Sequence, residues 1–256
     1  MCTAFIHRGN DVIFGFNMDI NVGAFRYDIY ADQDCFCIGC PADLHLFHDE
    51  IPPFYQVENN FRKIHGVNRQ GAFAACLNNM NFHKAPFRLA ADACSLDQLT
   101  DDVISGRRTL KEVSEFAGQV EIVTLPGGAV AVPNPGFHAL MGDEDGSILV
   151  LEPGNGYAVV QEKYAVMTNF PLLELPTDLT DATAGFYGRD RYDTALEMLR
   201  KAGDGFSPEA ALRVLEATKQ TGRWATRVSF VYSCREKTVF WCLEGAFDSI
   251  RTHHFR

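Results

Sequence analysis

The sequence predicts an α+β fold in which stacked sheets are covered by helices. Short apolar runs bounded by turn residues recur through the chain, two pairs of amphipathic helical segments lie between them, and strands close the sequence. Groups of strands that alternate with groups of helices are typical of layered α+β proteins. A chain of 256 residues with 46% hydrophobic residues is long enough for one large domain or two small ones. Because no linker or repeat interrupts it, we expect a single domain over 1–256.

The first elements are expected to be strands. Apolar runs on both sides of the turn-rich tetrapeptide at 8–11 predict an N-terminal hairpin. The segment 41–60 mixes prolines, aromatic residues and acids without a period, which is typical of a long surface loop. The strands of this half are expected at 3–7, 12–16, within 26–39, and at 62–66 and 71–79.

Helices are expected where apolar residues recur at helical spacing after a capping residue. Thr109 with Glu112 three residues later has the pattern of a capping box, and Ser207 before Pro208 has the pattern of a cap followed by proline. Turn residues between short apolar runs predict a β meander over 119–168, with one turn at 126–128, and a closing hairpin. The expected helices are 96–105, 109–117, 188–202 and 208 to near Gly222, and the closing strands are 226–233 and 238–243.

The charge of the chain argues against nucleic-acid and membrane partners. Its formal net charge is −10, from 33 Asp and Glu against 23 Lys and Arg. A surface of this sign repels phosphate backbones and anionic lipid headgroups. No apolar run is long enough to cross a bilayer, and the charged N-terminal region lacks the apolar centre of a secretion signal. We therefore expect a cytoplasmic protein without nucleic-acid or membrane partners.

The eight cysteines are expected to be reduced thiols, because the chain carries no secretion signal. Cys35, Cys37 and Cys40 are close enough in sequence to hold a metal or to pass electrons, but no second ligand pair accompanies them. The alternation of Cys35 and Cys37 with Phe36 and Ile38 is typical of the two faces of a strand. We expect no metal and no cofactor. A thiol redox or metal protein that uses these three cysteines stays open as an alternative.

Cys2 directly follows the initiator methionine. A residue this small at the second position permits removal of Met1, which would leave a nucleophile at the start of the chain. A free α-amine has a pKa near ~7.7–8 and a thiol near ~8.5, so one residue would hold both a general base and a nucleophile. The sequence thus offers a candidate catalytic cysteine that requires no separate histidine.

Four groups of short motifs follow Cys2, and their order along the chain is informative. They are Gly-Phe-Asn-Met-Asp at 15–19, His-Gly-Val-Asn-Arg-Gln-Gly at 65–71 leading to Cys-Leu-Asn at 76–78, Met-Thr-Asn-Phe-Pro at 167–171 and Arg-Tyr at 191–192. Each is weak alone, but the joint order resembles the choloylglycine hydrolase and penicillin V acylase family of N-terminal nucleophile (Ntn) hydrolases. The resemblance implies a four-layer αββα sandwich of two stacked, mainly antiparallel sheets. It also implies hydrolysis of a linear amide C–N bond.

The resemblance assigns a catalytic role to five positions. Cys2 would be the nucleophile, and Asp19 would hold the terminal amine beside the thiol. Asn78 and Asn169 would form the oxyanion hole, and Arg191 would sit beside the nucleophile. The substrate would be a small-molecule N-acyl amide that forms a thioester with the enzyme.

Phe16 departs from the family pattern, since it stands where the family has an arginine. Without that guanidinium, the pKa of the Cys2 thiol is expected to be higher unless Arg191 or another cation compensates, and the floor of the site is expected to be more apolar. The main alternative is therefore a catalytically weak or inactive family member that binds a small molecule.

Two further parts of the resemblance carry less weight. Arg189 lies only two residues before Arg191 and competes with it for the role of the family arginine. The paired strands that run from His138 to Glu152 also match the family, and we expect them to carry architecture only.

The identity of the acyl and amine groups is not readable from the sequence. Bile-salt conjugates, phenoxyacetyl or aliphatic amides and N-acyl amino acids all present the same linear amide to Cys2. Selectivity resides in loops such as 41–60, whose shape the sequence does not give. The oligomeric state is also open, a homo-oligomer included.

Overall fold

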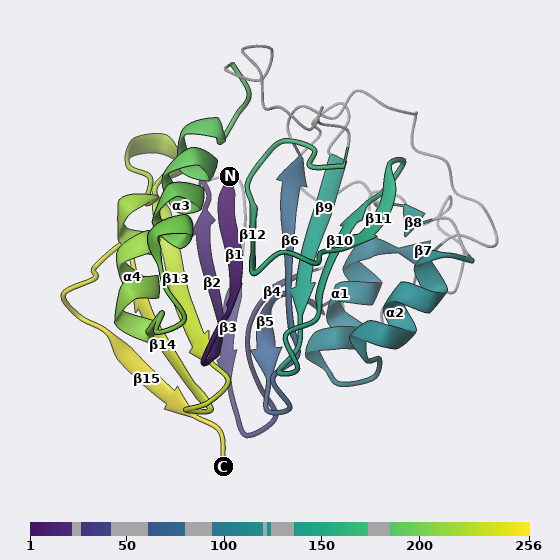
Figure 1. Ribbon diagram of the computed structural model, residues 1–256, viewed down its shortest axis with the longest axis horizontal. Coiled ribbons are helices and arrows are strands. Elements are labelled where there is room, and N and C mark those ends of the chain that lie inside the picture. Colours follow the sequence, from purple (N-terminus) through teal and green to yellow (C-terminus); the bar gives the residue numbers. More distant parts are fainter. Residues whose placement is uncertain (22–26, 42–60, 80–93, 120–121, 124–135, 174–184) are drawn as a thin grey trace.

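Two stacked sheets form the centre of the computed structural model, and helices cover their outer faces (Figure 1). The loop expected at 41–60, apart from residue 41, and the turn expected at 126–128 lie outside the described residues. The structure describes residues 1–21, 27–41, 61–79, 94–119, 122–123, 136–173 and 185–256.

The first sheet has six strands in the order β12-β1-β2-β13-β14-β15, and every neighbouring pair is antiparallel. The expected N-terminal hairpin is present as β1 and β2, which pair from Cys2 opposite Met18 to Arg8 opposite Val12. The strands of this sheet are β1 (Cys2–Arg8), β2 (Val12–Asp19), β12 (Tyr164–Met167), β13 (Thr226–Ser233), β14 (Thr238–Leu243) and β15 (Arg251–His254).

The second sheet has seven strands in the order β11-β10-β9-β6-β5-β4-β3, again antiparallel throughout. A separate pair of two-residue strands, β7 (Cys94–Ser95) and β8 (Ile122–Val123), is parallel. The strands of the seven-stranded sheet are β3 (Asp28–Ala31), β4 (Cys35–Pro41), β5 (Phe61–Asn68), β6 (Phe73–Asn79), β9 (Gly136–Gly142), β10 (Ile148–Glu152) and β11 (Gly156–Val159).

Two pairs of helices form the outer layers (Figure 1). The capping box expected at Thr109 and Glu112 is present, and Ser207 caps the helix that begins with Pro208. One pair, α1 (Leu96–Ile104) and α2 (Leu110–Ala117), covers the seven-stranded sheet, while α3 (Arg189–Lys201) and α4 (Pro208–Ala217) cover the six-stranded sheet. The four-layer αββα arrangement expected from the motifs is therefore confirmed.

The core between the sheets is apolar and rich in phenylalanine. Side chains alternate along the strands, so Phe14 and Phe16 of β2 face the second sheet, while Phe5 of β1 faces the helices. Gly15 lies opposite Phe5, and a Cβ atom there would come within 2.2 Å of the Phe5 ring. Each buried aromatic side chain stabilises the fold by about 2–3 kcal/mol. This packing fixes the β1–β2 hairpin and, with it, the position of Cys2.

Two expectations about these elements are wrong. The final helix ends at Ala217 rather than near Gly222, and a short 3₁₀ helix, Gly222–Trp224, follows it. Strand β12 does not continue the expected meander, because it leaves the second sheet and pairs with β1 in the first. That crossover brings the end of β12 beside Cys2.

Candidate active site

Cys2 is the first residue of β1, and its side chain belongs to the core between the two sheets. Only 6% of the residue is exposed. Its backbone nitrogen donates a hydrogen bond of 3.1 Å to Asn169 Oδ1. The thiol therefore faces the inter-sheet space, while the main chain is held by a side chain from the residues after β12.

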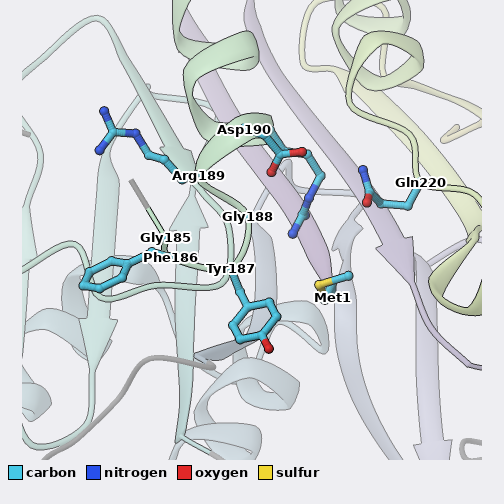
Figure 2. A pocket seen from close by; sticks show the side chains of 9 residues that line it. Met1, Gly185, Phe186, Tyr187, Gly188, Arg189, Asp190 and Gln220 are labelled. Atoms are coloured by element: carbon cyan, nitrogen blue, oxygen red, sulfur yellow. The ribbon is translucent and has the colours of Figure 1, made fainter. Parts of the chain in front are cut away.

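Met1 extends the strand pairing by one residue beyond Cys2. Its α-amine donates to the carbonyl of Asp19, and the N–H of Asp19 donates back to Met1 O at 2.7 Å. A pocket of about 340 Å³ opens at this point and is lined by Met1, residues 185–191 and Gln220. Figure 2 shows Tyr187 and Gln220 on either side of Met1, while Arg189 points away from it. Removal of Met1 would enlarge this pocket at the position of the Cys2 amine.

Asn169 links Cys2 to the second sheet. Its Oδ1 accepts from Cys2 N and from Arg191 Nη2, the latter at 2.6 Å. Since both neighbours can only donate, the amide oxygen must face them, and Nδ2 then faces Asn78, whose carbonyl it contacts at 2.6 Å. The Oδ1 atom of Asn78 is buried and has no hydrogen-bond partner among the described residues. Asn169 thus contacts the candidate nucleophile directly, and Asn78 contacts Asn169.

Arg191 reaches the main chain of Cys2 from helix α3. Its Nη1 donates to Cys2 O and, at 2.9 Å, to Thr3 Oγ1, and it lies 3.4 Å from Asp19 Oδ2. Gly188 precedes the helix with φ 85°, and a Cβ atom there would come within 2.7 Å of Arg191 Nη2. Only 3% of Arg191 is exposed. Of the two competing arginines, Arg191 is therefore the one that lies at Cys2.

Asp19 ends strand β2 and is fully buried. Its Oδ2 faces Arg191, and its Oδ1 accepts a hydrogen bond of 2.6 Å from Thr226 Oγ1. Thr226 lies opposite Asp19 in the ladder between β13 and β2, which places the hydroxyl where the carboxylate needs a donor. Thr226 and Thr3 were not among the residues predicted for the site, and their only signal in the sequence is a hydroxyl residue near a strand end.

Burial raises the pKa of the Cys2 thiol above its ordinary value, and the negative charge of Asp19 acts in the same direction. The positive charges of the chain terminus and of Arg191 lower that pKa and oppose burial in part. Desolvation is therefore the main cause of the raised pKa, and Arg191 opposes it only in part. An amine at Cys2 itself would place a base at the thiol without any further side chain.

Phe16, which occupies the position of the family arginine, has no exposed surface. Its ring stacks on His65 at 4.2 Å between centroids and also contacts Phe230 at 5.5 Å. Burial lowers the pKa of His65 to about 3, so this histidine is neutral near pH 7 and brings no cation to the site. Phe16 is thus part of the same inter-sheet core as Cys2 and not an exposed floor of a pocket. Among the described side chains, Arg191 donates to the main chain of Cys2.

Asp19 gives the stability of the protein a specific pH dependence. Burial raises the pKa of its carboxyl from 3.8 to about 6, against the opposing effects of Arg191 and the Thr226 hydrogen bond. The folded state therefore holds this proton more tightly than the unfolded state does. The stabilising contribution of Asp19 is complete below the unfolded pKa and is lost as the pH rises through about 6, by on the order of 3 kcal/mol.

We expect Asp19→Asn to remove that dependence. Urea unfolding at about pH 4 and about pH 7 should show the wild type losing free energy of unfolding relative to the variant as the pH rises. Parallel pH curves for the two proteins would contradict the burial of an ionisable group at this position.

The cysteine cluster shows strand alternation, as expected. Cys35 and Cys37 face helix α1, whereas Phe36 and Ile38 face the inter-sheet core. The Sγ atoms of Cys35 and Cys37 are 3.8 Å apart, and each of the seven cysteines whose side chains are described is free. Within the described ranges, no group of three His, Cys, Asp or Glu residues is arranged to hold a metal ion. None of the helices in the described ranges is long and apolar enough to span a bilayer.

Solved structures share the architecture of this chain, although no protein-family model and no curated protein matches its sequence. The C2A mutant of conjugated bile acid hydrolase from Clostridium perfringens has 15% sequence identity and a TM-score of 0.66, and the match covers 98% of this chain and 92% of that chain. Penicillin V acylase from Agrobacterium tumefaciens has 15% identity and a TM-score of 0.58, with 94% of this chain and 83% of that chain covered. The chain therefore has the Ntn-hydrolase fold of these structural neighbours.

Proposed function

We propose that this protein hydrolyses a linear N-acyl amide through Cys2 after Met1 has been removed, as a member of the choloylglycine hydrolase and penicillin V acylase family. The observation that supports the proposal is that two polar side chains contact the main chain of one buried cysteine, and that both are held by further polar groups. Asn169 accepts from Cys2 N, Arg191 donates to Cys2 O, and Asp19 and Asn78 contact these two side chains in turn. A buried cysteine in an inert core needs no such surroundings.

The free amine of Cys2 would activate its own thiol. After removal of Met1, the α-amine takes the thiol proton, either directly or through one water molecule. Asp19 and Arg191 keep the amine in place, because the carboxylate and the guanidinium hold each other and the adjacent main chain. The raised pKa of the buried thiol makes this local base necessary for attack near neutral pH.

The thiolate would then attack the amide carbonyl and form a C–S bond. The oxyanion that develops is bound by the amide nitrogen of Asn169 and by an N–H of Asn78, and donors of this kind are worth about 3–4 kcal/mol each. The protonated α-amine of Cys2 gives its proton to the leaving nitrogen as the C–N bond breaks. An acyl thioester on Cys2 remains, and the amine product departs.

Water would complete the cycle. The α-amine of Cys2 takes a proton from a water molecule, which attacks the thioester at the same oxyanion site. The C–S bond breaks, the carboxylic acid leaves, and the thiol regains its proton. The same three groups, amine, sulfur and oxyanion donors, thus serve both half-reactions.

The substrate would be an N-acyl amide whose carbonyl reaches Cys2 through the pocket around Met1. The names of the structural neighbours, a conjugated bile acid hydrolase and a penicillin V acylase, place conjugated bile acids and penicillin V first among compounds to test. N-acyl amino acids and phenoxyacetyl or aliphatic amides complete the range.

A leader peptide that a specific protease removes immediately before Cys2 tests the proposal on a single preparation. Before cleavage the α-amine of Cys2 is part of a peptide bond, so we expect no hydrolysis of any amide in this range. After cleavage we expect turnover and, in intact-mass spectra, a transient acyl adduct on Cys2. Binding of these amides without turnover in the released protein would instead establish a non-catalytic binding protein.

A further inference from the structure

A buried histidine and a buried glutamate hold both ends of the short segment that carries Asn169. His138 lies on β9 and Glu152 ends β10, and they are 0% and 1% exposed. His138 Nδ1 lies 3.1 Å from Glu152 Oε1. The pair sits in the second sheet and contacts residues that follow β12 of the first sheet.

The contacts of this pair lie on either side of Asn169. His138 Nε2 lies 2.9 Å from the carbonyl oxygen of Thr168, the residue before Asn169. On the other side of Asn169, Glu152 accepts two backbone hydrogen bonds. Leu172 N donates to Oε1 at 2.5 Å, and Leu173 N donates to Oε2 at 2.9 Å. Three hydrogen bonds thus fix the main chain before and after the amide side chain.

The hydrogen-bond partners of Glu152 favour its ionised form. Burial raises the pKa of Glu152, but the hydrogen bond and charge of His138 and the N–H groups of Leu172 and Leu173 outweigh it, so the pKa is lowered overall. A carboxylate that accepts from these two amides also faces His138 Nδ1, while the other ring nitrogen, Nε2, faces the carbonyl of Thr168. The pair is therefore a buried histidine and carboxylate that contact each other and the segment.

Strand pairing does not hold this segment. Strand β12 ends at Met167, so residues 168–173 lie beyond the ladder with β1. Phe170 packs against Phe186 and Tyr192, with ring centroids 6.1 and 5.2 Å away, and this anchors one side chain of the segment. The main chain on both sides of Asn169 depends on the histidine and the glutamate.

We propose that His138 and Glu152 are positioning residues that set the place of Asn169 at the oxyanion site. This inference rests on the proposed hydrolysis and names residues that the reaction itself does not touch. A shift of about 1 Å in an oxyanion donor costs on the order of 100-fold in rate, because the donor must meet charge that exists only in the transition state.

Glu152→Gln tests the inference with nearly unchanged volume. The amide of glutamine carries one oxygen and one NH₂ group in place of two oxygens. Its NH₂ group must therefore face a backbone N–H that now donates to the carboxylate, either that of Leu173 or that of Leu172 beside His138 Nδ1. His138→Phe is the second variant, and it removes the contact with Thr168 O. The matched control is Asp143→Asn, an acid-to-amide change in the turn at the other end of the same strands, where Asp143 Oδ1 accepts from Ser147 N at 2.9 Å.

Three measurements separate positioning from a general loss of structure. They are kcat and KM on the best amide, inhibition by the aldehyde of the same acyl group, and the rate of Cys2 alkylation by iodoacetamide. The aldehyde adduct needs the oxyanion donors, whereas alkylation needs only the thiolate. We expect both variants to lose about 10- to 100-fold in kcat and in aldehyde affinity, with KM and alkylation unchanged. The control should behave as the wild type does.

If the wild type is active, two results would overturn this inference. One is an equal loss in all three measurements, and the other is wild-type behaviour of both variants. Failure of one variant to fold leaves the other to decide, and failure of both overturns a specific positioning role. A wild-type protein that neither hydrolyses the amides nor binds the aldehydes would overturn the proposed function, and this inference with it.

Discussion

Cys2→Ala in the released protein is expected to remove nearly all amide hydrolysis. The variant keeps the α-amine, the asparagines and Arg191 but has no sulfur to form the thioester. Loss of a catalytic nucleophile costs on the order of 10⁴- to 10⁶-fold in kcat. The measurement is turnover of the best amide together with intact-mass detection of the acyl adduct, which should be absent from the variant.

Cys76→Ala is the matched control for this result. Cys76 is also a buried thiol, on strand β6 of the second sheet, but its side chain faces the helix layer and not the inter-sheet core. Burial raises the pKa of its thiol well above the ordinary value. We expect the control to keep its activity. Bound metal, or thiol-dependent turnover that survives in Cys2→Ala, would instead favour the thiol redox or metal alternative.

Arg191→Met is expected to have the largest effect on stability. The substitution leaves the carboxylate of Asp19 buried without its cation, and it removes the donors that reach Cys2 O and Asn169 Oδ1. Removal of one partner from a buried ion pair costs about 3–5 kcal/mol. Urea unfolding near pH 7 measures this loss, and kcat should fall as well, because the carbonyl of Cys2 and the side chain of Asn169 lose the arginine that they share.

The chain supplies its own control two residues earlier. Arg189 pairs with Asp193 at 2.7 Å one helical turn away, and the carboxylate side chain is 50% exposed. An exposed pair at this spacing contributes about 0.3–0.5 kcal/mol, so Arg189→Met should barely change the free energy of unfolding. Similar losses in the two variants would show that Arg191 contributes as an ordinary helix residue and not through the buried network.

Local patterns predicted most strands and helices, and they failed where pairing depends on distant residues. The β1–β2 hairpin and the capped helix α2 follow from turn residues and from Thr109 with Glu112. Strand β15 was missed because Arg-Thr-His-His has no apolar alternation and lies at the edge of its sheet. The transfer of β12 to the first sheet was missed because the apolar run of 164–167 fits either sheet.

The candidate site was predictable as a set of residues but not as a geometry. The order of the motifs identified Cys2, Asp19, Asn169 and Arg191, and hydrogen bonds join these residues in the structure. No spacing rule placed Asp19 opposite Thr226, because that contact depends on the register of two strands far apart in sequence. Their catalytic roles stay predictions until the variants are assayed.

The opposite placement of the two chain ends has a practical consequence for anyone who studies this protein. Figure 1 shows the first residue near the layered sheets at one end of the molecule and the last residue at the other end. An affinity tag fused before Cys2 would occupy the amine that the proposed chemistry requires, and an activity survey of such fusions would score the protein as inert. A purification handle placed after Arg256 stays remote from the pocket and allows immobilised protein to be assayed directly.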